Sequence, residues 1–274
     1  MMDRRSVLAV VAGAVFAPRL GRADVVLPRT EIDDRLAQVF RDAGTDGTFV
    51  AYDAEARTLV ASDPVRWAKA MLPASTFKIP NSLIALETGV VGDPDKDLFK
   101  WDGVTRPFPD WNKDHTLRSA MAASAVPVYQ EIARRIGAER MQRFVDELGY
   151  GNKNIGGRID RFWLDGDMRI SAVEQIDFLD RLRRGVLPLS ARSQQLTRDI
   201  LPVTQAGDSV IRAKTGLVGV DERATATDIG WLVGWAETGA RWTVFALNLD
   251  IRERRHIAAR MPLAQKSLRL LGAI

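Results

Sequence analysis

The strongest hydrophobic pattern in the chain begins just after Ser75. Apolar side chains recur at helical spacing, at Phe77, Ile79, Leu83, Ile84 and Leu86. This spacing predicts a buried helix from Phe77 onward, and Gly89 is placed to end it. Pro80 falls in the opening turn, where its missing N–H costs little. Ser75 is therefore expected at or just inside the N-terminus of a buried helix.

The rest of the chain shows both helical and strand patterns. Amphipathic spacing predicts helices over residues 33–43, 116–123, 128–136, 138–148 and 257–271. Another helix is predicted to begin at Ser171, because Ser171 and Glu174 form a capping box ahead of an apolar stripe. Alternating patterns predict strands over residues 48–53, 57–62, 66–71, 210–213, 229–237 and 241–250.

The order of these elements indicates the fold class. Strands lie towards both ends of the chain, and helices occupy its middle. The economical architecture is α/β of the α+β type, with a central antiparallel sheet flanked by terminal helices and a helical lobe, roughly residues 90–205, inserted into it. An active site is expected in the cleft between the lobe and the sheet.

The N-terminus has the pattern of an export signal. A short basic segment precedes an apolar run over residues 7–17, and Gly21-Arg22-Ala23 offers a small-x-small cleavage site. The run is too short to span a bilayer permanently, so residues 1–23 are predicted to be a signal peptide and residues 24–274 an exported, periplasmic domain. The Arg4-Arg5 pair raises the alternative of a twin-arginine route. A disordered or anchoring N-terminal arm stays open as another interpretation.

Composition narrows the chemistry. The 274 residues are 46% hydrophobic and 27% charged, with a net charge of +4, and no basic stripe is interleaved with aromatics, so no nucleic-acid partner is predicted. The chain has no cysteine, which excludes disulfides and a thiol nucleophile. His115 and His256 lack metal-ligand spacing, so no metal site is predicted. There is no Gly-x-Ser-x-Gly elbow, which disfavours a Ser-His-Asp hydrolase.

Ser75 and Lys78 together are typical of an activated nucleophile. Lys78 follows Ser75 by one helical turn, so both side chains are expected on one face. A serine hydroxyl needs a neighbouring base, and burial can keep a lysine neutral enough to be that base. A Ser-x-x-Lys pair also arises by chance in a chain of this length, so the pair alone leaves a purely structural helix start open.

Two further segments could complete such a site. Lys214-Thr215-Gly216 follows a predicted strand, where a lysine and a threonine can bind an anionic group and the glycine lets a substrate lie along the strand edge. The alternative for this segment is an ordinary turn at the end of a strand. Ser124 lies in an interruption between predicted helices, where it could supply a third side chain or simply cap a helix.

Taken in order, these segments resemble the class D β-lactamases of the serine penicillin-recognising superfamily. The four matching boxes are Ser75-Thr76-Phe77-Lys78, Ser124-Ala125-Val126, Tyr150-Gly151-Asn152 and Lys214-Thr215-Gly216. Phe162-Trp163-Leu164 is similar to the segment whose tryptophan holds a modified lysine in that family, and Arg260 falls where the family has an arginine that binds the substrate carboxylate. The resemblance covers essentially the whole chain after Ala23.

The resemblance implies hydrolysis of β-lactams through an acyl-enzyme. Ser75 would attack the lactam carbonyl, and Lys78, carboxylated by carbon dioxide, would be the base in both steps. No other cofactor is implied. Ser124 and Lys214 would relay a proton to the leaving nitrogen.

The resemblance also assigns supporting roles. Phe77, Val126, Trp163 and Leu164 would keep Lys78 dry, and the Trp163 indole N–H would donate to the carbamate. The backbone N–H groups of Ser75 and Leu217 would form the oxyanion hole. The remaining substrate contacts are expected from Val126, Thr215, Gly216 and Arg260.

Two related functions remain as alternatives. A β-lactam sensor domain shares the first box, but it is preceded by transmembrane helices, whereas this chain shows only a cleavable signal. A penicillin-binding peptidase lacks the second box and the Phe-Trp-Leu segment. Residues 217–227 depart from the family's short link, and the range of β-lactams and the oligomeric state stay open.

Overall fold

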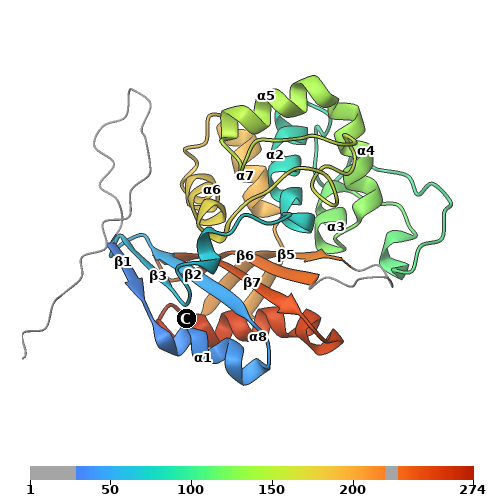
Figure 1. Ribbon diagram of the computed structural model, residues 1–274. Helices are drawn as coiled ribbons and strands as arrows, with labels where there is room; N and C mark the ends of the chain where they lie inside the picture. The colour runs from blue at the N-terminus through green and yellow to red at the C-terminus, as the bar shows by residue number, and fades with distance from the viewer. Residues whose placement is uncertain (1–28, 220–227) are drawn as a thin grey trace, which may run out of the picture.

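A seven-stranded sheet divides the molecule into two layers of helices (Figure 1). The computed structural model describes residues 29–219 and 228–274. The strands, in their order across the sheet, are β1 (Arg29–Ile32), β3 (Thr58–Ala61), β2 (Gly47–Asp53), β7 (Arg241–Ile251), β6 (Asp228–Thr238), β5 (Ser209–Val218) and β4 (Val203–Ala206). Every neighbouring pair is antiparallel except β1 with β3. The α+β class with a central antiparallel sheet is confirmed.

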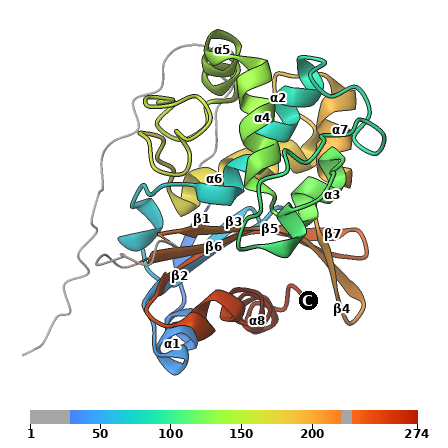
Figure 2. The ribbon, with the colours of Figure 1, turned by 90° about the vertical axis from the view of Figure 1, so that its right-hand side faces the viewer.

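The two terminal helices cover one face of this sheet. They are α1 (Asp34–Ala43) and α8 (Arg254–Leu270), which pack side by side in both views (Figures 1 and 2). Their buried positions, such as Leu36 and Leu263, join an apolar cluster with one face of the central strands. In that cluster Phe49 of β2 stacks on Phe245 of β7 with ring centroids 5.8 Å apart. The alternation of strand side chains sends their neighbours to the opposite face.

The other helices lie on the opposite face and form the helical lobe (Figure 2). They are α2 (Lys78–Glu87), α3 (Leu117–Ala122), α4 (Val126–Ile136), α5 (Ala138–Leu148), α6 (Ala172–Arg184) and α7 (Ala191–Asp199). Helix α2 is the centre of this lobe, since all its residues except Glu87 are buried and it contacts α4, α5 and α7. A helix that is buried all round needs no polar face, which fits the apolar run towards the end of α2, at Leu83, Ile84 and Leu86.

Several predicted elements are confirmed. Ser171 caps α6 and forms the expected box: its hydroxyl accepts the Glu174 N–H, and the Glu174 carboxylate accepts the Ser171 N–H. The hairpins β2–β3 and β6–β7 also form where alternation predicted them.

The strand predicted over residues 66–71 is wrong. Residues Arg66–Ala68 form the 3₁₀ turn η1, and Met71 makes only a single bridge to Ile170. The reason is local, because the Asp63 carboxylate accepts the N–H groups of Val65 and Arg66 and so closes the backbone into a turn. Strands β1 and β4 and helix α7 were not predicted.

The predicted signal peptide, residues 1–23, lies outside the described residues. Across residues 29–219 and 228–274, no helix has the length and apolar character needed to cross a bilayer.

The capping box of α6 gives a stability prediction. Ser171→Ala removes the acceptor for the Glu174 N–H and the hydroxyl that donates to the Glu174 carboxylate. We expect it to lower the free energy of unfolding by about 1 kcal/mol, measured by urea denaturation. Thr105→Ala, an exposed site outside any helix, is the control and should change stability by less than about 0.5 kcal/mol. Equal effects of the two substitutions would contradict the capping role.

Candidate active site

Ser75 and Lys78 meet at the start of the central helix. Ser75 lies in the 3₁₀ turn η2 (Ala74–Phe77), which runs directly into α2 at Lys78. Lys78 Nζ and Ser75 Oγ are hydrogen-bonded at 2.7 Å. The turn is tightly fixed: Ala74 adopts a positive φ of 48°, and its N–H donates to the Trp163 carbonyl at 3.0 Å. The predicted one-turn pairing of serine and lysine is present, with a 3₁₀ turn in place of the first α-helical residues.

The environment of Lys78 disfavours the charged form of its amine. Its side chain is 0% exposed, and burial holds the pKa of its amine well below the usual range, with the nearby Lys214 cation acting in the same direction. Its amine nitrogen lies 5.2 Å from the centroid of the Tyr129 ring. A neutral amine beside a serine hydroxyl can accept that hydroxyl's proton.

The sequence did not single out Tyr129. It lies on α4 three residues after Val126, the half-buried first residue of that helix, so the i, i+3 spacing could have indicated a shared face. The Tyr129 hydroxyl is hydrogen-bonded to Ser82 Oγ at 2.9 Å. The ring is therefore held in place against the lysine amine.

Ser124 faces the sheet and does not cap a helix. The N-cap of α4 is Ala125, which makes no side-chain cap, so the capping alternative is wrong. Ser124 has a positive φ of 52°. This backbone conformation accompanies a contact between the helical lobe and the sheet, in which Lys214 Nζ donates to Ser124 Oγ at 3.0 Å. The same amine donates to the Thr215 carbonyl at 3.0 Å and to Thr215 Oγ1 at 3.2 Å.

Two basic side chains, Lys214 and Arg260, lie on the sheet side of the site. Burial, with repulsion from Arg260 acting in the same direction, lowers the pKa of Lys214 to about 7. Burial also lowers the pKa of Arg260 to about 10. The Arg260 guanidinium is anchored by donating to the Ile257 carbonyl and, at 2.7 Å, to the Gly216 carbonyl. With five N–H donors on a guanidinium, donors remain for an anion.

Lys214-Thr215-Gly216 lies inside strand β5, so both the predicted end of the strand at residue 213 and the turn alternative are wrong. A side chain at Gly216 would begin 3.1 Å from the Pro73 carbonyl oxygen and from the Thr76 methyl group. Because real Cβ atoms rarely come that close, glycine is what allows the strand to lie against the turn that carries Ser75.

Strand β5 presents an open edge beyond the end of β4. The Ala213 N–H donates to the Pro202 carbonyl, on the side of β4. Since the period along a strand is two residues, the N–H groups of Thr215 and Leu217 point to that same side. Pairing with β4 ends at Arg212, so within the described residues no strand occupies this part of the edge. Leu217 is the last residue but one of β5.

An aromatic cluster surrounds the base of the site. Phe77 stacks on Trp163 with ring centroids 5.4 Å apart, and both side chains are 0% exposed. Leu164 is half-buried and packs against the same core. Trp163 Nε1 is buried and finds no hydrogen-bond acceptor among the residues that the structure describes. A buried unpaired donor is costly, so an acceptor of suitable size is expected beside this nitrogen.

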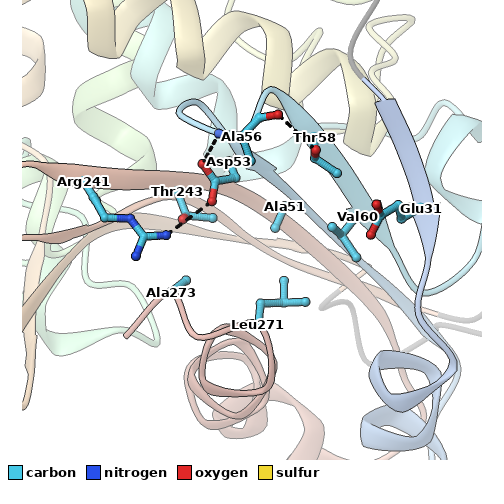
Figure 3. A pocket seen from close by; sticks show the side chains of 10 residues that line it. All are labelled: Glu31, Ala51, Asp53, Ala56, Thr58, Val60, Arg241, Thr243, Leu271 and Ala273. Carbon is cyan, nitrogen blue, oxygen red and sulfur yellow. Dashed lines mark hydrogen bonds and ion pairs between the residues drawn. The ribbon is translucent and has the colours of Figure 1, made fainter.

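A groove elsewhere on the molecule does not include these residues. It has a volume of about 260 Å³ and lies between strands of the sheet and the end of α8 (Figure 3). Asp53 accepts the N–H groups of Glu55 and Ala56 there and pairs with Arg241 at 3.5 Å. These contacts fix the β2–β3 hairpin.

In the described part of the chain, no group of three or more acidic or histidine side chains is arranged to hold a metal ion.

Comparisons with known proteins agree on one family. The family model described as the penicillin binding protein transpeptidase domain matches residues 47–269. The chain is 43% identical over 230 residues to β-lactamase OXA-48 of Klebsiella pneumoniae, covering 84% of this chain and 85% of that one. It is 40% identical over 235 residues to β-lactamase OXA-10 of Pseudomonas aeruginosa, covering 86% and 88%. Among solved structures, the class D β-lactamase YbXI from Nostoc superposes with a TM-score of 0.82 at 41% identity, covering 87% of this chain and 99% of that one.

The two cations give a prediction about proton affinity. Arg260→Gln removes a positive charge near Lys214, and loss of a like charge favours the protonated amine, so the pKa of Lys214 should rise above about 7. Side-chain NMR of labelled lysine, titrated against pH, measures this value directly. Arg269→Gln, at an exposed position of α8, is the matched control and should leave the Lys214 titration unchanged. A pKa that falls or does not move in Arg260→Gln would contradict the electrostatic picture.

Proposed function

The chain belongs to the class D β-lactamases, enzymes that hydrolyse β-lactams, and we propose that it works through an acyl-enzyme formed on Ser75. The observation that carries the proposal is the 2.7 Å contact between Ser75 Oγ and the amine of a lysine with no exposed surface. Ser75 Oγ attacks the lactam carbonyl carbon, the C–N bond of the ring breaks, and water later hydrolyses the ester. Burial lowers the pKa of Lys78 and so favours the uncharged form that a base requires.

The surroundings of Lys78 fit a carbamate formed with carbon dioxide. Only a neutral amine reacts with carbon dioxide, giving a carbamate anion and a proton, and burial of Lys78 favours its neutral form. Trp163 Nε1 is a buried donor that finds no acceptor in the described residues, which suits a carbamate oxygen. Phe77, Val126 and Leu164 would limit access of water to it. Such a group supplies a carboxylate-like base for both acylation and deacylation.

Ser124 and Lys214 are proposed to carry the proton to the leaving nitrogen. Their side chains are hydrogen-bonded at 3.0 Å, and Ser124 lies on the lobe while Lys214 lies on the sheet. A pKa of about 7 lets Lys214 hold or release a proton near neutral pH, which is the range where general acid catalysis is efficient.

The open edge of β5 is proposed to bind the substrate. The Leu217 N–H on that edge and the Ser75 N–H in the first turn of η2 would stabilise the oxyanion. Thr215 Oγ1 and the remaining donors of Arg260 would hold the substrate carboxylate, with Gly216 leaving room for the ring beside the strand.

We also propose that residues 1–23 direct export to the periplasm and that residues 24–274 form the catalytic domain.

The nucleophile is tested by trapping the covalent adduct. Ser75→Ala should abolish both turnover and the penicilloyl adduct seen by mass spectrometry, because it removes the hydroxyl that is hydrogen-bonded to the buried lysine amine. The free energy of unfolding should fall by no more than about 0.5–1.5 kcal/mol, the net contribution of one hydrogen bond. Ser190→Ala, at the N-cap of α7, is the control and should keep the adduct. An adduct on any residue other than Ser75 would refute the assignment, and a wild-type adduct that is never released would favour the sensor alternative.

The carbamate is tested with labelled bicarbonate. Wild-type enzyme should show a ¹³C carbamate signal on Lys78 in NMR. Trp163→Phe keeps an aromatic ring but removes the indole donor. It should therefore need about 10-fold or more bicarbonate than wild type to reach the same carbamate signal, as expected for loss of a charge-assisted bond that contributes about 1.5–3 kcal/mol. Deacylation should slow more than substrate binding weakens.

The matched control for this substitution is Trp242→Phe. Trp242 Nε1 is also buried without an acceptor among the described residues, but its ring lies under Arg183, outside the motif segments. Its bicarbonate dependence should match that of wild type. Wild-type activity that is indifferent to bicarbonate, with no carbamate signal, would mean that Lys78 acts as a plain amine.

A further inference from the structure

A buried glutamine links the helical lobe to the turn that carries Ser75. Gln175 lies in the first turn of α6 and is 1% exposed. Its amide nitrogen donates to Thr76 Oγ1 at 2.9 Å and to the Tyr150 hydroxyl at 3.3 Å. Thr76 is the residue immediately after Ser75, and it is 0% exposed. None of the sequence motifs includes Gln175.

The direction of these bonds is fixed by the threonine. Thr76 Oγ1 donates its proton to the Pro73 carbonyl at 2.7 Å, so the same oxygen must accept from Gln175. Only a donor at position 175 completes this chain. A carboxylate in the same place could not donate to Thr76.

The chain of bonds ends at the strand that faces the substrate. The Pro73 carbonyl oxygen and the Thr76 methyl group both lie 3.1 Å from the position a Gly216 Cβ would take. The turn therefore touches β5 through the two groups that the Gln175 bond orients. Moving Thr76 would change the distance between Ser75 and the β5 edge, which carries the Leu217 N–H.

We propose that Gln175 is a positioning residue for acylation: it fixes Thr76, and through Thr76 the placement of Ser75 against strand β5. The inference rests on the acyl-enzyme function proposed above. Gln175 does not reach the reacting atoms itself. Because catalysis depends on the geometry of attack, a displacement of about 1 Å can cost about 100-fold in rate. The effect should fall on attack by Ser75 and leave carbamate formation on Lys78 intact.

A second buried glutamine provides the matched control. Gln194 on α7 is also 1% exposed, and its amide donates to the carbonyls of Leu187 and Leu189. Gln194→Leu removes the same kind of buried bonds in the same lobe without touching the Ser75 turn. Any effect shared by the two substitutions is a general loss of stability.

The experiment compares Gln175→Leu with Gln194→Leu by rapid mixing with a chromogenic cephalosporin. Gln175→Leu should lower the acylation rate constant by roughly 10- to 100-fold and leave the bicarbonate dependence unchanged. Gln194→Leu should acylate at the wild-type rate even if its melting temperature falls. Thr76→Val should cause a similar loss, and the double variant with Gln175→Leu should lose little more, because both changes break one chain. Equal rates in the two leucine variants, or fully additive losses in the double variant, would overturn the proposal.

Gln175→Glu tests the need for a donor. A buried carboxyl has a raised pKa, so lowering the pH from about 8 to about 5.5 should protonate it and let it donate to Thr76. At saturating bicarbonate, its acylation rate relative to wild type should therefore rise as the pH falls. A ratio that stays flat or falls would refute the donor role. If wild-type enzyme itself forms no adduct on Ser75, the proposed function fails; if it does, and Gln175→Leu acylates normally, only the role of Gln175 fails.

Discussion

Burial of one amine is the constraint on which the rest of the site depends. A lysine inside a protein costs free energy unless it loses its charge or is paired. Here Lys78 opens a helix that is buried on every side, and a second cation, Lys214, lies on the facing strand. Both influences favour the neutral amine. The fold thereby favours, directly beside Ser75, the neutral amine that the proposed base and the proposed carbamate both require.

The same burial explains why the site needs both layers of the molecule. Phe77 and Trp163 come from the lobe side, while Lys214 and Arg260 come from the sheet and its covering helix. The close approach of Gly216 to the Ser75 turn joins the two. The buried Lys78 amine and the polar side chains of the sheet are thereby brought to the same turn, the one that carries Ser75.

Each box alone was a weak signal, and it was their order along the chain, as a resemblance to a known family, that gave them roles, which stay predictions. Alternation located the hairpins. Other features depended on contacts distant in sequence. Strand β1 is exposed along its whole length and shows no alternation, and α7 is mostly polar, so neither had a hydrophobic signal. Residues 66–71 have the sequence pattern of a strand, but hydrogen bonds from the backbone to the Asp63 carboxylate fold their start into a turn. Gln175 looked like any residue of an amphipathic helix, since its partner Thr76 lies 99 residues earlier.

The most direct test of this account is the titration of the Lys78 amine in enzyme freed of carbon dioxide. Lysine labelled at the ε position, with Lys78→Met to assign the signal, reports its protonation by NMR. The account predicts a pKa well below the usual value of 10.5. A Lys78 amine that stays protonated until the pH approaches 10.5 would contradict the claim that burial makes this lysine the base.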